Sequence, residues 1–195
     1  RSNEVAQAPV WCARWRDQER TLPTASPIRT AAPDETATSA RVIIIGTGFA
    51  GLGMAARLKR GGMADFLILE RAGDVGGTWR DNTYPGCACD VPSVLYSFSF
   101  APNSEWSNTY SPQPEIWSYL QRVATEEGLL PDIRFDRTVE GARWDEDRRV
   151  WIVETTNGSY EGQVLIAGLG PLSEPSLPDI EGIDTHLHVE RTRHG

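Results

Sequence analysis

The sequence predicts an α/β fold that combines a parallel sheet, a crossover helix and a small antiparallel β-meander. Two short apolar runs, residues 42–45 and 66–69, have the composition of buried parallel strands. A glycine-rich turn and an amphipathic segment separate these runs, which is the pattern of a β-α-β unit. Farther along the chain, residues 138–167 alternate apolar and polar positions around Asn157-Gly158, a strong signal for a β-hairpin.

The turn after the first strand carries the spacing G-x-G-x-x-G, formed by Gly46, Gly48 and Gly51. The first glycine permits a sharp turn, the second lets a pyrophosphate approach the backbone, and the third allows close packing of helix on sheet. The free N–H groups and positive dipole end of the following helix favour phosphate. Glu70 ends the second strand, about 20 residues after the last glycine, where an acid accepts hydrogen bonds from a ribose diol. These features predict a Rossmann-like dinucleotide site.

Two other interpretations of this unit stay open. A glycine-rich turn also occurs in α/β domains that bind no nucleotide. Arg71 is compatible with the 2′-phosphate of NADP, but the adjacent Glu70 would repel that phosphate, so an unmodified adenosine ribose fits better.

Composition excludes several classes of protein. The chain has 195 residues, 39% of them hydrophobic, and a net charge of −8, which argues against a nucleic-acid partner. No apolar run is long enough to cross a membrane. Three cysteines form neither a disulfide framework nor, with the histidines and acids around them, a metal set. We therefore expect buried thiols, no metal and a cytoplasmic location.

The two ends of the chain differ in composition from its middle. Residues 1–40 are rich in Thr, Ala, Ser and Pro, and we expect a disordered extension there. An organellar transit peptide is an alternative, against which the acidic residues count. Residues 41–172 form the expected nucleotide-binding domain, and residues 173–195, with several prolines, an irregular linker.

A long segment rich in Gly, Pro, Asp and Asn follows Glu70, and such loops are commonly functional. Gly76 and Gly77 allow the backbone to approach a ligand. Thr78 offers a hydroxyl to phosphate, and Trp79 a flat surface for stacking. Asp90 has apolar neighbours, so we expect either a cationic partner or an altered proton affinity; a surface turn acid is the alternative.

Regular structure is expected on both sides of residue 111. The alternation in residues 96–100, YSFSF, predicts a short strand. Ser111 is the expected cap of a helix that begins with two prolines and ends at Gly128. One stripe of that helix is apolar and predicted to pack in the core: Ile116, Tyr119, Leu120, Val123 and Ala124.

Several separated segments together resemble the class B flavoprotein monooxygenases, which include Baeyer–Villiger monooxygenases and flavin-containing monooxygenases. The resemblance covers about residues 41–184 and rests on GTGFAGLGMAARL, LERAGDVGGTW, YPGCACDVPSVLYSFSF, SPQPEIWSYL and IAGLGPLSEPSLPDI. It implies an FAD-binding domain, FAD as bound cofactor, NADPH as electron donor and dioxygen as co-substrate. The substrate implied is a small molecule: a ketone, a sulfide or an amine.

The resemblance also implies roles for single residues. Those expected to bind FAD are Gly46, Gly48, Ala50 and Gly51 at the pyrophosphate, Glu70 at the ribose, Gly76, Gly77, Thr78 and Trp79 beyond it, Asp90 and Tyr96 near the flavin, and Val139 through its backbone at the adenine. In the family, the acid matching Asp90 lies beside the flavin and pairs with an arginine of the NADPH domain. Asp90 is therefore the expected catalytic residue.

The sequence departs from the family pattern after residue 170, where no second G-x-G-x-x-G follows. The NADPH domain is thus expected to be missing, the FAD domain incomplete and the chain inactive by itself. Two alternatives remain: an inactive FAD- or nucleotide-binding fragment, and an NAD-dependent dehydrogenase-like module. The histidines of the tail, His186, His188 and His194, are expected to be an incidental group rather than a metal site.

Overall fold

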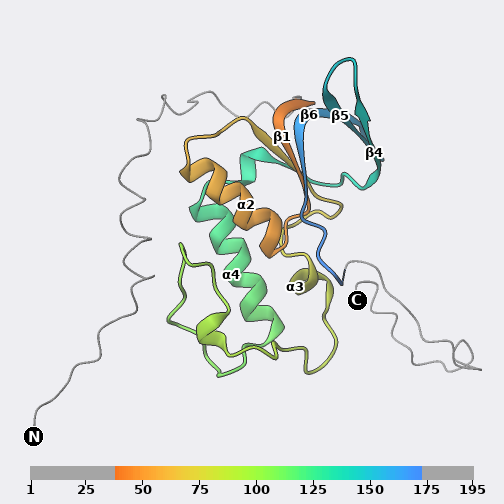
Figure 1. Ribbon diagram of the computed structural model, residues 1–195. Helices are drawn as coiled ribbons and strands as arrows, with labels where there is room; N and C mark the ends of the chain where they lie inside the picture. The colour runs from red at the N-terminus through yellow and green to blue at the C-terminus, as the bar shows by residue number, and fades with distance from the viewer. Residues whose placement is uncertain (1–37, 173–195) are drawn as a thin grey trace, which may run out of the picture.

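A computed structural model describes residues 38–172, which form a mixed six-stranded sheet and the helices packed on it (Figure 1). The predicted α/β class is confirmed. The strands are β1 (Ser39–Ile45), β2 (Phe66–Leu69), β3 (Ile133–Arg134), β4 (Val139–Asp145), β5 (Val150–Thr155) and β6 (Gly158–Ala167). The helices are α2 (Phe49–Arg60), α3 (Thr78–Asp81) and α4 (Gln113–Glu126), with 3₁₀ turns η2 (Ser93–Leu95) and η3 (Leu130–Asp132).

The parallel half of the sheet is built around β1. The strand order is β3-β2-β1-β6-β5-β4, and β1 pairs in parallel with both β2 and β6. Because Ile43 and Ile44 point to opposite faces of this central strand, both faces must be covered, and both side chains are fully buried. The apolar run of residues 42–45 is therefore, as predicted, a strand that is buried on both faces.

The antiparallel half is a meander, as predicted. β5 and β6 form a hairpin in which Thr155 pairs with Gly158, so the two turn residues are Thr156 and Asn157. Gly158 has a φ of 102°, a conformation that glycine adopts at little cost. Farther along, β6 leaves β5 after Gly162 and pairs only with β1, which carries the chain back into the parallel sheet.

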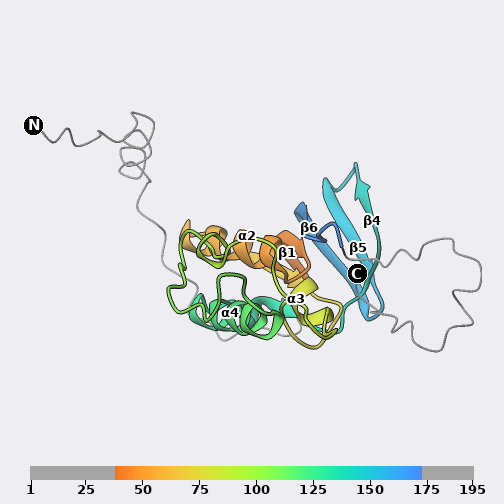
Figure 2. The same cartoon turned by 90° about the horizontal axis from the view of Figure 1, so that it is seen from below.

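The two faces of the sheet are covered by different elements. On one face, the main core cluster joins strand residues such as Ile44 and Ile68 to Leu52 of α2 and Leu120 of α4. On the other, Ile43, Leu67 and Leu69 form a cluster with Val153 and Tyr160 of the meander. Figure 2 shows α2 and α4 on one side of the molecule and β4 and β5 on the other. The predicted apolar stripe of α4 is buried: Ile116, Tyr119, Leu120, Val123 and Ala124.

Three expectations need correction. β1 begins at Ser39, inside the expected disordered extension, because Ser39 and Ala40 pair with β6. Residues 96–100 are not a strand: η2 precedes them, and only an isolated bridge joins Phe98 to Ala101. Their aromatic side chains pack on α2 and α4 instead of pairing with a sheet.

The predicted helix cap at Ser111 is also wrong. α4 begins at Gln113, its cap residue is Pro112, and no side chain caps it. The Ser111 hydroxyl is fully buried and lies 2.7 Å from the Ser93 hydroxyl, so it holds the preceding coil rather than the helix.

The expectations for residues 1–37 and 173–195, which include the disordered extension, the linker and the tail histidines, lie outside the described residues. No helix within residues 38–172 has the length and apolar character needed to cross a membrane. The same part of the chain contains no group of three or more His, Cys, Asp or Glu residues placed to hold a metal.

Candidate cofactor-binding site

A large open cleft, about 1120 Å³ in volume, lies beyond the carboxyl ends of β1, β2 and β6. Its walls come from the turn after β1, the coil from the end of β2 through α3, and the segments before β4 and after β6. In open α/β sheets this edge is the place where ligands bind.

The glycine-rich turn forms one wall through direct contacts between backbones. A Cβ on Gly46 would lie 2.7 Å from the Gly168 oxygen, and φ at Gly46 is 92°. A Cβ on Gly77 would lie 3.0 Å from Cα of Gly48, so the two glycine segments touch across the cleft wall. Gly51 is not among the lining residues; a Cβ there would lie 1.8 Å from the Gly46 oxygen. Its lack of a side chain lets α2 start close to β1.

The N-terminus of α2 opens on this cleft. Its cap residue is Gly48, no side chain caps the helix, and its first turn has no acid. The first N–H groups of this 12-residue helix therefore offer hydrogen-bond donors and a positive dipole end that no acid of the first turn neutralises. An anion is the ligand that such an end binds best.

Glu70 lies beside this helix end and is 3% exposed. Its Oε2 accepts hydrogen bonds from the backbone N of Thr47 at 2.9 Å and from Thr47 Oγ1 at 2.5 Å. Its Oε1 accepts from Ala72 N at 3.0 Å and from Arg80 Nη1 at 2.9 Å. The carboxylate is thus fixed in position by four donors.

Arg80 connects three parts of the wall. Besides Glu70, it donates to the Asp74 carbonyl at 2.7 Å and, through Nε, to Asp81 Oδ1 at 2.6 Å. Burial opposes the charge of Arg80, but the hydrogen bond to Asp81 and the negative charges of Glu70 and Asp81 raise its pKa overall. Arg80 therefore stays cationic and joins α3 to the end of β2.

Trp79 and Tyr96 form an aromatic part of the wall. Trp79 Nε1 donates to the Tyr96 hydroxyl at 3.0 Å, and the rings meet edge to face with centroids 5.6 Å apart. Burial raises the pKa of Tyr96, and the nearby Cys89 and Asp90 add to the rise. The phenol is therefore neutral near pH 7. Trp79 is also held by Gln113, whose Nε2 donates to its carbonyl.

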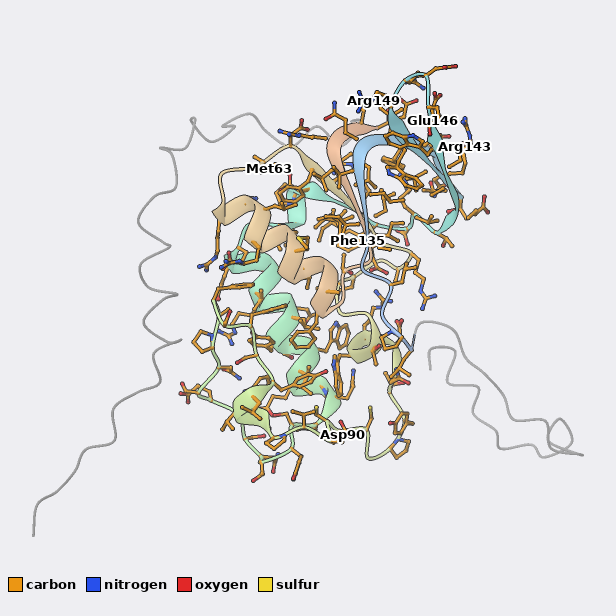
Figure 3. All side chains as sticks on the ribbon, in the orientation of Figure 1. Met63, Asp90, Phe135, Arg143, Glu146 and Arg149 are labelled. Carbon is orange, nitrogen blue, oxygen red and sulfur yellow. The ribbon has the colours of Figure 1, made fainter. Side chains whose placement is uncertain are left out.

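Asp90 lines the cleft but differs from its predicted environment. The side chain is exposed, and within residues 38–172 it has no hydrogen bond or ion pair. Of its apolar neighbours, Cys87 and Cys89 are buried, whereas Ala88 and Val91 are exposed as Asp90 is. The alternative of a surface acid is the one that the structure supports. Figure 3 shows Asp90 in the coil below α4, far from the meander residues Arg143, Glu146 and Arg149.

The cleft brings together the predicted residues except Gly51: Gly46, Gly48, Ala50, Glu70, Gly76, Gly77, Thr78, Trp79, Asp90, Tyr96 and Val139 all line it. Sequence reasoning missed Thr47, Arg80 and Arg137, which line it as well. Thr47 occupies a variable position of the glycine motif, where no side-chain role is expected. Arg80 directly follows the predicted segment from Gly76 to Trp79, and this adjacency was the signal that could have identified it as a site residue.

Comparison with known proteins defines the class. Residues 43–195 match the family described as pyridine nucleotide-disulphide oxidoreductase, and the chain belongs to this family. Within it, the chain corresponds to the N-terminal part of a class B flavoprotein monooxygenase, as its relatives show.

A Baeyer–Villiger monooxygenase of Streptomyces coelicolor is 57% identical over 145 residues, which are 74% of this chain and 28% of that protein. A Baeyer–Villiger monooxygenase of Pseudomonas aeruginosa is 44% identical over the same shares of the two chains. Among solved structures, an oxidised steroid monooxygenase bound to NADP has 41% identity and a TM-score of 0.69, over 75% of this chain and 29% of that one. The chain thus spans less than a third of the length of these relatives.

Proposed function

We propose that this chain is the FAD-binding part of an NADPH- and dioxygen-dependent monooxygenase. The contact between Gly48 and Gly77, beside the uncapped start of α2, is the observation that carries the proposal. Because neither glycine has a side chain, bare backbone lines this part of the cleft, and a pyrophosphate needs such a surface. A solved relative in complex with FAD and NADP, 37% identical with a TM-score of 0.68, supports the same ligands.

We assign each group of cleft residues to one part of FAD. The turn of Gly46, Gly48, Ala50 and Gly51 would hold the pyrophosphate, with Gly51 acting through helix packing. Glu70 would accept the ribose hydroxyls, and the Val139 backbone would contact the adenine. The segment from Gly76 to Trp79 would cover the cofactor beyond the pyrophosphate, and Tyr96 and Asp90 would lie near the flavin ring.

When bound, FAD would supply the redox chemistry, taking hydride from NADPH and activating dioxygen. The chain's own residues would bind, orient and shield it. Asp90 is the proposed catalytic residue: its exposed carboxylate lines the cleft and has no cationic partner within residues 38–172, so it is free to pair with a cation from elsewhere. The proposed substrate is a small molecule: a ketone that undergoes Baeyer–Villiger oxidation, or a sulfide or amine.

The organisation of the whole protein is part of the proposal. Residues 39–172 would belong to the FAD domain, and residues 173–195 would be a linker toward an NADPH domain. Because the chain spans less than a third of the length of its relatives, it would not turn over NADPH alone. The buried free thiols Cys87 and Cys89 support a cytoplasmic location.

FAD titration of the purified chain tests the proposal, with flavin absorbance and fluorescence as readouts. We expect Gly48→Ala to weaken FAD binding at least about tenfold, because the new methyl group occupies the place of the pyrophosphate. The substitution should be compatible with folding, since the nearest atom to a Cβ at Gly48 is 3.8 Å away.

Gly141→Ala is the matched control, because a Cβ there meets nothing within 4 Å and the residue lies outside the cleft. It should bind FAD as the unaltered chain does. Tighter binding of NAD than of FAD would favour a dehydrogenase-like module, and a chain that binds neither would contradict the proposal.

A further inference from the structure

The carboxylate of Glu70 has no acceptor position left for a ligand. A carboxylate offers about four lone-pair positions. Four donors occupy them in Glu70: Thr47 N and Thr47 Oγ1 on Oε2, and Ala72 N and Arg80 Nη1 on Oε1. Thr47 is fully buried, and Glu70 nearly so. A ribose hydroxyl can therefore reach this carboxylate only by replacing one of the four donors.

The four donors differ in how readily they can leave. The N–H groups of Thr47 and Ala72 are fixed by the backbone, so they leave only if the turn itself moves. Arg80 supplies the positive charge for two buried carboxylates, Glu70 and Asp81, whose side chains are 4% and 7% exposed. Withdrawing it would leave the buried Glu70 carboxylate without its cation, which is costly. The Thr47 hydroxyl is neutral and rotates about a single bond.

We propose that the Thr47 hydroxyl holds the acceptor position on Glu70 that a ribose hydroxyl takes, so that the adenosine ribose binds by exchange with Thr47. The inference rests on the proposed function, which places a ribose at Glu70. One neutral O–H donor replaces another, so the ribose gains little from this hydrogen bond. Thr47 is thus a residue that sets cofactor affinity, and its hydroxyl lowers that affinity.

Replacing the hydroxyl by a methyl group tests the exchange. Thr47→Val keeps the β-branched shape and leaves one lone pair of Glu70 free for the ligand. In this variant the ribose hydroxyl gains a hydrogen bond to the Glu70 carboxylate without displacing another donor. Such a hydrogen bond to a charged group raises the affinity for the ligand about tenfold. We expect calorimetric titration to give about tenfold tighter binding of FAD and of ADP by this variant.

Three comparisons isolate the ribose hydroxyl. Thr47→Ser retains a hydroxyl and should bind like the unaltered chain. Thr125→Val removes a hydroxyl that donates to Gln121 O on α4, outside the cleft, and should change nothing. With 2′,3′-dideoxy-ADP, which lacks the competing hydroxyls, Thr47→Val should show no gain. Unliganded Thr47→Val should also melt at a lower temperature, because Glu70 has lost a donor.

The outcomes separate this inference from the proposed function. Equal or weaker binding of ADP and FAD by Thr47→Val, or an equal gain with the dideoxy nucleotide, would overturn the exchange while leaving FAD binding intact. A chain that binds ADP but not FAD would contradict the proposed function, and the ADP titrations would still decide the exchange. A chain that binds neither ligand would overturn both.

Discussion

The two walls of the cleft are stabilised in different ways. The turn between β1 and α2 is short, and its shape comes from backbone atoms in contact, as at Gly46 with Gly168 and Gly51 with Gly46. The coil between β2 and α4 is long, has only two short helical turns, and is held by side chains from elsewhere in the chain.

α4 supplies much of that support. Trp117 Nε1 donates to the Val75 carbonyl at 2.9 Å, and Gln121 Nε2 donates to Asp74 Oδ2 at 2.7 Å. Gln113 binds the carbonyl of Trp79.

The same helix also holds the later part of the coil. The Tyr119 hydroxyl accepts from Phe98 N at 2.7 Å and donates to Ala101 O at 2.8 Å. Four side chains of one helix thus hold five residues of the coil.

The difference predicts how each wall responds to change. A wall made of backbone contacts has little tolerance where an added carbon would collide with another backbone atom, as at Gly46 and Gly51. A wall held by many side-chain hydrogen bonds loses them one at a time, and each loss costs a limited amount. The first three of the four predictions below test this contrast, and the fourth tests an ion pair between α2 and the residue after α4. The largest expected effect comes first.

Gly51→Ala should abolish folding or lower the free energy of unfolding by more than about 4 kcal/mol. The new Cβ would stand 1.8 Å from the Gly46 oxygen and 2.9 Å from its carbonyl carbon. Soluble yield and chemical denaturation measure the effect, with Gly141→Ala as control. A well-folded Gly51→Ala chain would show that the first wall is as tolerant as the second.

Arg80→Met should lower the free energy of unfolding by about 3 kcal/mol, because Glu70 and Asp81 would lose a cation in a buried site. Arg71 also lies 3.4 Å from Asp81 and compensates part of this loss. Denaturation at neutral pH measures the change. Arg122→Met, on an exposed pair with Glu126, is the control and should have little effect.

Tyr119→Phe should cost about 2 kcal/mol, because the N–H of Phe98 and the carbonyl of Ala101 lose their partner in a partly buried region. Hydrogen exchange should show faster exchange at Phe98 and unchanged protection in β1. If protection in β1 falls equally, the coil and the parallel sheet unfold together and the contrast between the walls is wrong.

Acidification should give the smallest effect. The hydrogen bond from Arg60 lowers the pKa of Glu127 from its ordinary value of 4.5. A pKa that is lower in the folded state adds stability above the unfolded value, and this contribution disappears as the pH falls below 4.5 toward the folded value. Melting temperatures across this range should fall more for the unaltered chain than for Glu127→Gln. An equal fall in both would show that this pair does not contribute.

The sequence by itself determined the parallel core and the backbone wall. The run at residues 42–45 is apolar at every position, so only a strand covered on both faces satisfies it. The glycine spacing implies close contacts between backbone atoms, and the contact of Gly51 with Gly46 lies within the turn itself, so it depends on local sterics. For the same reason the hairpin at Asn157-Gly158 could be predicted from a few residues.

Only the tertiary structure decided the second wall and the state of the acids in it. The alternation of residues 96–100 has the period of a strand, but Phe98 and Phe100 pack against the core cluster that α2 and α4 help to form. Asp90 is exposed, so of its two predicted environments the structure has the surface one, and Glu70 is buried with Thr47 and Arg80, two partners that were not predicted. The partners of a side chain come from residues far away in the sequence, and no local pattern specifies them.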